Sequence, residues 1–251
     1  MGNTPMYGDL AALYDLFIDW PSRLKNELPL LERLGVSGSR LRIVDVACGT
    51  GHHARAFAER GHRVIALDAE QAMIERARAT EERNLVDWRV GTFFDAPADA
   101  QADVLLCLGT SLPHVESVEQ CRRALKAFGR SLQPGGRLIV HSRNLPKTLR
   151  AEQRFLPPIA RKQDSLTVLF WRFYDLMPPD HVRFHLAILR EEPGNWTHTV
   201  LSSLLTVASA ELLAEMAGAA GFENVRVLGH LDGRPYDLMT SPDLVLVAER
   251  G

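Results

Sequence analysis

The sequence predicts an α/β fold built on a doubly wound, mostly parallel seven-stranded sheet, and three observations support this prediction. A buried strand at residues 42–46 runs into a turn containing Gly49 and Gly51, and a helix follows the turn. Apolar strands and amphipathic helices then alternate up to residue 144, which is typical of a parallel sheet. Three β-rich runs without helices between them come next, so we expect an antiparallel insertion after the fifth strand.

Composition limits the classes of partner that fit this chain. With 251 residues, 46% of them hydrophobic, the chain can bury one core and carry one elaboration. The formal net charge is −2, from 29 basic and 31 acidic residues, so no global field attracts nucleic acid or an anionic membrane. We therefore expect a small-molecule partner, no nucleic acid and no membrane. A homo-oligomer is compatible with the sequence.

Cysteine usage and the lack of long apolar runs indicate a cytoplasmic location. The three cysteines are widely spaced and odd in number, which favours a reduced setting over a disulfide framework. No charged leader with an apolar run begins the sequence, and no stretch reaches the roughly 18 apolar residues of a membrane helix. We find no clustered His and Cys spacing of the metal-binding kind, so no metal is expected.

An N-terminal helical lid is predicted over residues 1–40. Residues 10–20 and 21–34 have the pattern of one or two amphipathic helices ending at Gly35. Trp20 and Arg23 are candidate cofactor contacts, because an aromatic ring could cover an adenosine and a guanidinium could pair with a carboxylate. The alternatives are that Trp20 packs in the core and Arg23 is a solvated helix charge.

The turn after the first strand and the end of the second strand together predict an adenosine site. Gly49 and Gly51 let the backbone turn sharply and approach a ligand, since neither carries a Cβ atom. Asp68 ends the second strand, where open α/β sheets place an acid on a ribose diol; the alternative is a helix N-cap. Asp45 could fix the glycine loop or lie near an ammonium group, and a structural role is equally open. Because the glycines also satisfy the dinucleotide pattern, a nicotinamide cofactor stays open.

Three further loops follow strands and should meet at the same edge of the sheet. Thr92 and Phe93 follow the third strand, where an adenine ring could lie against the aromatic side chain; Phe93 could equally be core. The loop from Thr110 to His114 follows the fourth strand. His114 could donate to a cofactor, bind substrate or cap a turn. We expect the adjacent pair at residues 52–53, two histidines at a helix start, to be ordinary surface residues.

Arg143 and Asn144 follow the fifth strand. A guanidinium at the carboxyl end of a strand can fork a carboxylate with two parallel hydrogen bonds, which makes Arg143 the leading substrate contact. The alternative is an ion pair with an acid of the protein.

The order of predicted elements gives the domain organisation. The first half of the sheet comprises strands 42–46, 63–68 and 85–91 with helices 52–60 and 70–82, and the second half begins with strand 102–108, helix 118–132 and strand 137–141. The insertion holds runs 165–177, 181–191 and 196–207, and helix 209–220 and strands 222–229 and 243–249 complete the sheet, with the last strand reversed. We therefore divide the chain into a lid (1–40), a cofactor-binding half (41–144), an antiparallel substrate cap (145–207) and a C-terminal part of the core (208–251).

Three of these segments resemble the motifs of class I S-adenosylmethionine-dependent methyltransferases. They are Val-Asp-Val-Ala-Cys-Gly-Thr-Gly at 44–51, Asp68 with Met73, and Gln-Pro-Gly-Gly-Arg-Leu at 133–138. The segments at 107–114 and 141–144 further resemble glycine N-methyltransferases, which also carry an antiparallel insertion after the fifth strand. The resemblance implies a Rossmann-like methyltransferase fold that uses S-adenosyl-L-methionine.

The same resemblance assigns residues to the two halves of the site. In that family the cofactor is surrounded by the positions matching Arg23, Ala47, Asp68, Met73, Thr92, Phe93, Leu108 and His114. The position matching Arg143 holds the glycine carboxylate, and Thr110 and Asn144 complete the expected acceptor site. The family has asparagine at the positions of Thr110 and Thr92, and a tyrosine where this chain has Leu186.

We therefore predict a methyltransferase acting on a small amine or amino acid that bears a carboxylate. No catalytic residue is assigned, because holding donor and acceptor in line in a site closed to water can account for much of the rate. O-methylation of a small molecule, nicotinamide-dependent oxidoreduction and cofactor binding without catalysis stay open as alternatives. A nucleic-acid methyltransferase would need a basic track, and none is visible.

Overall fold

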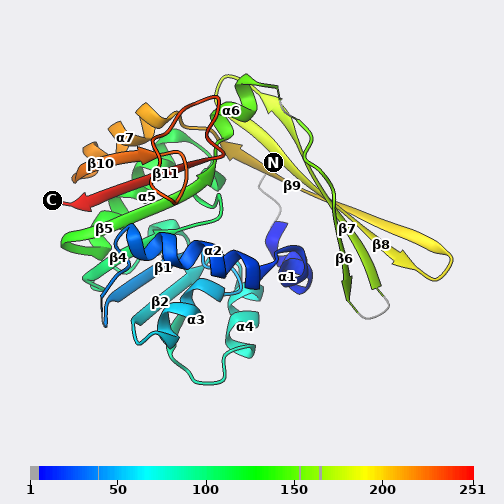
Figure 1. The fold of residues 1–251 in the computed structure, drawn as a ribbon, viewed down its shortest axis with the longest axis horizontal. Coiled ribbons are helices and arrows are strands. Elements are labelled where there is room, and N and C mark those ends of the chain that lie inside the picture. The colour runs from blue at the N-terminus through cyan, green and yellow to red at the C-terminus, as the bar shows by residue number, and fades with distance from the viewer. Residues whose placement is uncertain (1–5, 39, 153, 164–165) are drawn as a thin grey trace.

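A seven-stranded sheet with helices on both faces forms the body of the protein in the computed structural model, which describes residues 6–38, 40–152, 154–163 and 166–251 (Figure 1). The strands of the described body are β1 (Arg42–Val46), β2 (Arg63–Asp68), β3 (Val86–Val90), β4 (Ala102–Cys107), β5 (Leu132–Arg143), β10 (Phe222–Leu228) and β11 (Asp243–Arg250). Their order is β10-β11-β5-β4-β1-β2-β3, and only pairs involving β11 are antiparallel among these described strands. The predicted fold class, including the reversed last strand, is confirmed.

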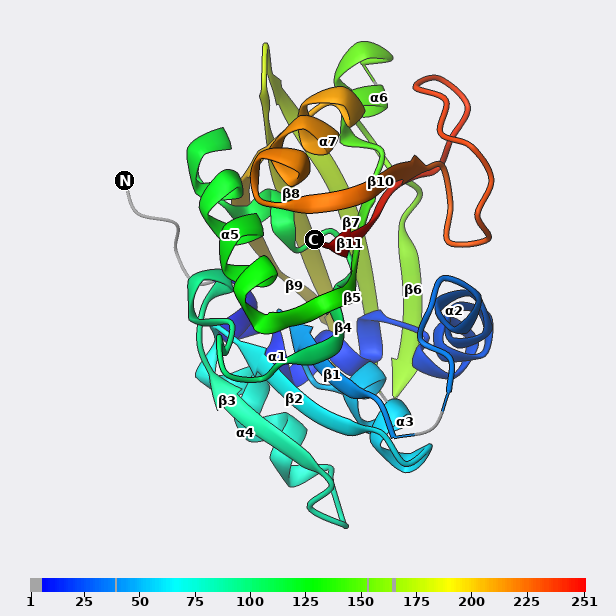
Figure 2. The same cartoon turned by 90° about the vertical axis from the view of Figure 1, so that its left-hand side faces the viewer.

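Helices cover the two faces of this sheet and bury a separate core on each. They are α2 (Trp20–Arg33), α3 (His52–Glu59), α4 (Gln71–Ala79), α5 (Val118–Ser131) and α7 (Ala210–Ala219), whereas α1 (Met6–Phe17) and α6 (Leu145–Arg150) pack against the insertion. On one face α5 and α7 pack through Phe128 and Met216, and on the other α2, α3 and α4 pack through Leu31, Phe57 and Ile74. Figure 2 shows α5 and α7 on the opposite side of the sheet from α2 and α3.

The insertion is a second, antiparallel sheet of four described strands, β6 (Ile159–Gln163), β7 (Leu166–Met177), β8 (His181–Glu192) and β9 (Asn195–Thr206). The sequence predicted three strands, so β6 is a correction. It was missed because this short edge strand is largely exposed and carries charged residues, which hide the β pattern. Residue 165, where we placed the start of the first predicted run, which corresponds to β7, lies outside the described residues. The insertion extends away from the body (Figure 1).

Two boundaries around β5 also differ from the prediction. The strand begins at Leu132 rather than at 137, because residues 133–136 bulge out between the pairs Ala102–Leu132 and Val104–Arg137 instead of ending a separate turn. After β5 the short helix α6 precedes the insertion, with the Asn144 side chain as its N-cap. The sequence did not predict this helix.

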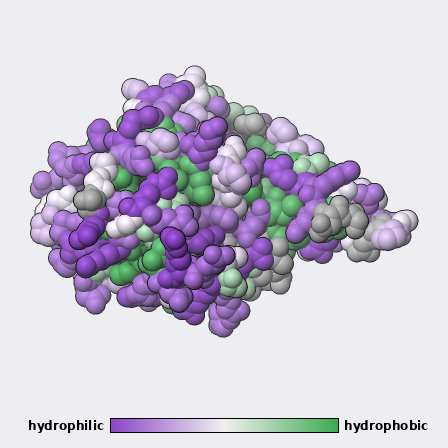
Figure 3. Space-filling view, turned by 60° about the horizontal axis from the view of Figure 1, so that its bottom comes forward, coloured by the Kyte–Doolittle hydropathy of each residue, from purple (hydrophilic) through white to green (hydrophobic). Residues whose placement is uncertain are grey.

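The helices predicted in the N-terminal segment are present as α1 and α2, with α1 ending at Phe17 and α2 beginning at Trp20, and these two helices are called the lid below. Figure 1 shows α1 between the body and the insertion. Phe17 of α1 packs on Phe170 of β7, with 5.0 Å between the ring centroids. None of the described helices is long and apolar enough to cross a lipid bilayer. Hydrophilic residues predominate on the face shown in Figure 3, with apolar patches between them.

Candidate functional site

A cavity of about 420 Å³ lies at the carboxyl ends of β1, β2, β3 and β4. This volume falls within the range of small-molecule sites, and the edge is where open α/β sheets bind ligands. Its walls come from the body, from α1 and from the insertion. The lining residues are Tyr14, Ala47, Gly49, Asp68, Ala69, Glu70, Met73, Gly91, Thr92, Phe93, Phe94, Gly109, Ser111, His114, Val115, Glu116, Gln120 and Ser203.

The turn after β1 shapes one wall of the cavity through its unusual backbone. Ala47 has a φ of 57°, a left-handed conformation that costs free energy in a residue with a Cβ atom, and such outliers gather at binding sites. Gly49 has a φ of 58° and faces Tyr14, whose Cε1 would lie 3.4 Å from an added Cβ. Gly51 does not line the cavity: a Cβ there would lie 2.2 Å from the Trp88 ring. Packing, rather than a ligand's approach, therefore accounts for Gly51.

Asp68 joins this turn to the end of β2. Its Oδ2 accepts a hydrogen bond of 2.8 Å from the Gly49 N–H, and its Oδ1 accepts one of 2.9 Å from the Glu70 N–H. The N-cap of α4 is Glu70 rather than Asp68. Burial raises the pKa of Asp68 despite these two bonds. Asp45 lies behind the turn, buried, and burial together with the Asp68 charge raises its pKa to about 7.

The loop after β3 is held by a local capping box. The Thr92 N–H and hydroxyl both donate to Asp95 Oδ2, at 2.9 and 2.7 Å, and Thr92 Oγ1 accepts from the Phe94 N–H at 3.3 Å. This arrangement turns the loop so that Thr92 and Phe93 line the cavity. The Phe93 ring also meets Phe128 of the core edge-on, so Phe93 both lines the cavity and packs against the core.

The opposite wall joins the body to the insertion. His114 Nδ1 lies 2.9 Å from Oγ of Ser203 on β9, and both residues line the cavity. Burial lowers the pKa of His114 to about 4, so its imidazole is neutral at pH 7. A neutral ring keeps one nitrogen as a hydrogen-bond acceptor, which a cation could not do.

The lid is clamped to the glycine turn through Asp15 of α1. Its Oδ1 accepts a 2.7 Å bond from the Thr50 hydroxyl and lies 3.0 Å from His52 Nε2, and its Oδ2 accepts a 2.6 Å bond from Arg76 Nε. Burial alone would raise the pKa of Asp15, but these three contacts outweigh it and lower the pKa well below its usual range. Three segments therefore converge on one carboxylate.

A second clamp involves Glu27 of α2. Glu27 accepts from Arg23 Nε at 3.0 Å and lies 2.8 Å from His53 Nε2. Burial opposes ionisation of Glu27, but the His53 hydrogen bond and the Arg23 charge lower its pKa to about 2. Burial lowers the pKa of His53. A neutral imidazole therefore donates to an ionised carboxylate.

These clamps correct the prediction that His52 and His53 are ordinary surface residues. His53 is buried, and His52 is partly buried and stacks on Trp20 with 4.3 Å between the ring centroids. Trp20 is itself buried, and the Arg23 guanidinium lies 5.1 Å from its ring centroid. The local sequence could not predict that the lid covers these two histidines, because their contacts with the lid are between segments distant in the sequence.

The structure brings seven of the predicted cofactor residues to the cavity wall: Ala47, Gly49, Asp68, Met73, Thr92, Phe93 and His114. Trp20, Arg23, Asp45, Gly51 and Leu108 are not among the lining residues; Leu108 is buried in the core beneath the loop. Sequence reasoning missed Tyr14, Glu70 and Ser203. An aromatic residue in a predicted lid was the available signal for Tyr14, whose pKa burial raises to about 12. Nothing in the β9 pattern marked Ser203.

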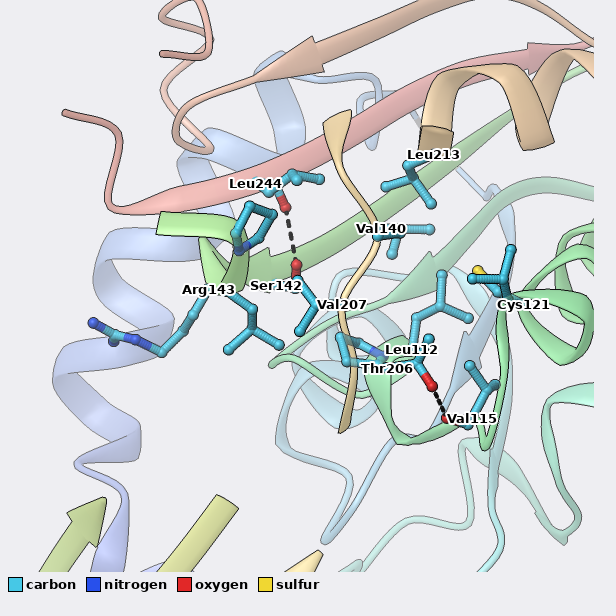
Figure 4. Close-up of a pocket in the computed structure, with 15 residues that line it drawn as sticks. Leu112, Val115, Cys121, Val140, Ser142, Arg143, Thr206, Val207, Leu213 and Leu244 are labelled. Atoms are coloured by element: carbon cyan, nitrogen blue, oxygen red, sulfur yellow. Dashed lines mark hydrogen bonds between the residues drawn. The ribbon is translucent and has the colours of Figure 1, made fainter. Parts of the chain in front are cut away.

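None of the three predicted acceptor residues lines the large cavity, although Thr110 lies between two residues that do, Gly109 and Ser111. The Thr110 hydroxyl accepts a 3.0 Å bond from the Arg143 N–H. Asn144 is buried and bonded to Leu238, Ser241 and Tyr236, so its side chain is engaged within the fold. In Figure 4 the exposed Arg143 side chain points away from the apolar side chains of a smaller cavity, of about 30 Å³.

Known proteins resemble this chain in sequence and in fold. Residues 43–136 match a family described as a methyltransferase domain. Over 139 residues the chain is 32% identical to a glycine/sarcosine N-methyltransferase of Halorhodospira halochloris, an alignment that covers 52% of this chain and 50% of the relative. These matches confirm the predicted resemblance to the class I S-adenosylmethionine-dependent methyltransferases. The cofactor of this chain is therefore S-adenosylmethionine, and its relatives include the glycine N-methyltransferase-like group, as the sequence predicted.

The chain has two further likenesses, to a curated protein and to a solved structure. It is 34% identical over 134 residues to a ubiquinone biosynthesis O-methyltransferase of Rickettsia conorii, covering 51% of this chain and 45% of that one. Its fold is similar to CalS10 of Micromonospora echinaspora, an amino pentose methyltransferase solved with S-adenosylmethionine, with a TM-score of 0.72, 23% identity and coverage of 96% and 95%. The chain spans about half the length of the curated relatives it matches.

The cavity fits S-adenosylmethionine on structural grounds. A left-handed turn at Ala47 and Gly49 brings bare backbone to the cavity, and the Asp68 carboxylate faces the same space. Among the described residues, no group of three or more His, Cys, Asp or Glu side chains could hold a metal ion.

Proposed function

We propose that this protein transfers a methyl group from S-adenosylmethionine to a small amine or amino acid that bears a carboxylate. The observation that carries the proposal is the cavity in which the Asp68 carboxylate, the turn at Ala47 and Gly49, and an insertion residue share one space. The relative named as a glycine/sarcosine N-methyltransferase supports an amino-acid acceptor.

The cofactor-side roles follow from the positions of the lining residues. Asp68 would accept hydrogen bonds from the ribose diol, since its two oxygens can take two hydroxyls. The loop at Thr92 and Phe93 would bound the adenine, with the Phe93 ring offering an aromatic face. Tyr14 closes the cavity from the lid. When bound, the cofactor supplies an electrophilic methyl group on a sulfonium.

Positioning and exclusion of water would provide most of the rate. The clamps at Asp15 and Glu27 hold α1 against the glycine turn and α2 against α3, and a lid held in this way would limit the access of solvent to the cavity. Arg143 would fix the acceptor carboxylate and thereby aim the acceptor nitrogen. The neutral His114 has a nitrogen able to accept a proton or a hydrogen bond at the junction with the insertion.

The activity is tested by measuring release of S-adenosylhomocysteine with a panel of amines, amino acids and phenols. We expect turnover with carboxylate-bearing amines. The likeness to the ubiquinone biosynthesis O-methyltransferase makes phenols the second candidate class, and turnover of phenols alone would replace N-methylation by O-methylation. Binding of S-adenosylmethionine without turnover of any class would favour a non-catalytic role. Binding of a nicotinamide dinucleotide in its place would favour the oxidoreductase.

Asp68→Asn tests the ribose contact. The substitution keeps the shape of the side chain and removes its charge, and we expect S-adenosylhomocysteine to bind about tenfold more weakly by calorimetry. Asp99→Asn, at an exposed position outside the cavity, is the matched control and should bind as the wild type does. Equal affinity of the Asp68 and Asp99 variants would remove Asp68 from the cofactor site.

A further inference from the structure

Two arginines from different sheets lie near each other beside the cavity. Arg143 ends β5, and Arg172 lies in β7 of the insertion. The two positive charges act on each other and on Tyr174, which is two residues from Arg172 in β7. Among the residues described by the structure, neither arginine forms an ion pair with an acid. The region therefore holds two positive charges without an anion.

The environment of Arg172 makes this arrangement costly in the absence of a ligand. Its Nε is buried and has no hydrogen-bond partner among the described residues. The guanidinium lies 5.5 Å from the ring centroid of Phe17, which offers weak cation–π attraction. Arg172 is partly buried, and a charge withdrawn from water without a pairing partner is destabilising, which a second positive charge nearby increases.

The position of Arg172 connects the lid, the insertion and the end of β5. Side chains alternate along a strand, so Phe170, Arg172 and Tyr174 share the inner face of β7. Phe170 packs on the lid through Phe17, and Tyr174 packs in one cluster with Leu145 of α6. Arg172 therefore lies between the lid and the residues that follow Arg143.

This region also adjoins the cofactor cavity. The Arg143 N–H donates to Thr110, whose neighbours Gly109 and Ser111 line the cavity. In Figure 4 the Arg143 side chain points away from the small apolar cavity. An acceptor whose reacting atom enters the cofactor cavity could thus extend an acidic group to the two arginines.

We propose that Arg143 and Arg172 together bind the carboxylate of the methyl acceptor, so that the insertion supplies half of the anion site. The inference rests on the proposed methyltransferase function and adds Arg172 of the insertion to the Arg143 contact already proposed there. Each guanidinium can fork a carboxylate, and an anion shared between them neutralises the mutual repulsion of the pair. A bound carboxylate would also give the buried Arg172 Nε the hydrogen-bond partner that it lacks.

The test compares an acid with its uncharged analogue. N-acetylglycine and N-acetylglycinamide share a shape but differ in charge, and neither has an amine to methylate. Their dissociation constants are measured from ligand-dependent shifts of the thermal unfolding midpoint, with and without saturating S-adenosylhomocysteine. We expect the acid to bind the wild type at least about tenfold more tightly than the amide.

Variants of each arginine then assign the preference. Arg143→Met and Arg172→Met should each reduce the preference for the acid about tenfold. Arg172→Lys keeps the charge but cannot fork, and should also lose most of the preference. Arg183→Met is the matched control: Arg183 is exposed on the other face of the same sheet, and its loss should leave the preference unchanged. Without ligand, Arg172→Met should melt no lower than the wild type, because it removes a buried unpaired charge.

Three results would overturn the inference: equal binding of acid and amide to the wild type, loss of the preference only on substitution of Arg143, or a lower melting temperature of Arg172→Met with the preference intact. The last would make Arg172 structural. Failure of the proposed function is recognised separately. It would show as absent binding of S-adenosylhomocysteine or absent turnover, whereas binding of N-acetylglycine is also measured on the protein without S-adenosylhomocysteine.

Discussion

Asp15→Asn is the sharpest probe of how the lid is held over the cavity. The asparagine keeps the shape of the side chain but loses its charge, and its amide presents a donor toward groups that themselves donate. Asp15 accepts from Thr50 and Arg76 at 2.7 and 2.6 Å and lies 3.0 Å from His52. A hydrogen bond to a charged group contributes about 1.5–3 kcal/mol when buried. The Arg76 side chain is 38% exposed, which reduces its share to about 1 kcal/mol or less.

We therefore expect Asp15→Asn to lower the free energy of unfolding by about 2–3 kcal/mol in urea titrations followed by circular dichroism. Affinity for S-adenosylhomocysteine should fall as well, because Thr50 belongs to the turn that bounds the cavity. Asp87→Asn is the matched control, since its pair with Arg89 is exposed on both sides and should change stability by less than about 0.5 kcal/mol. If both variants unfold alike and bind alike, the carboxylate does not clamp the lid and the reasoning is refuted.

Two further predictions concern Glu27 and Gly51. The pKa of Glu27 is lowered from 4.5 to about 2 in the folded protein. The ionised carboxylate therefore contributes at most about 3 kcal/mol to the free energy of unfolding. This contribution is complete above pH 5 and is lost as the pH falls toward 2. The stability gap between wild type and Glu27→Gln should therefore shrink from pH 7 to pH 3 in urea titrations, and a constant gap would contradict the ionised clamp. Gly51→Ala should cost about 2–4 kcal/mol, because the Cβ would lie 2.2 Å from Trp88 at a φ of +77°. Gly61→Ala, with a φ of +90° and no atom within 4 Å, should cost only about 1–2 kcal/mol, and equal losses would show that backbone strain alone explains Gly51.

Local patterns were enough to predict the body of the fold. The strand at 63–68 was placed at its observed bounds, and the order of strands and helices gave the mostly parallel sheet with a reversed last strand. The predicted boundaries were wrong where pairing with a neighbouring strand determines where a strand begins. The bulge at 133–136 exists because β5 re-forms its pairing with β4 on both sides of those residues, and no single-strand pattern records such pairing.

The predicted site residues also form two groups, those that local pattern placed correctly at the cavity and those that tertiary packing places elsewhere. Residues placed directly after strands, such as Ala47, Asp68 and Thr92, reach the cavity because parallel strands end at one edge of a sheet. Gly51 is two positions from Gly49 in sequence, yet it packs on Trp88 of β3 instead. Trp20 and Leu108 were predicted as contacts and prove to be buried in packing.

The sequence by itself determined which chemistry lies at the edge of the sheet, because period, glycine placement and the end of each strand are local properties of the chain. Only the tertiary structure decided what covers that edge. Asp15 finds Thr50, Glu27 finds His53, and Arg172 comes to lie near Arg143 across segments far apart in the sequence. Such contacts depend on how a lid and an inserted sheet fold back onto the body, and the free energies that select them arise from burial and charge in three dimensions.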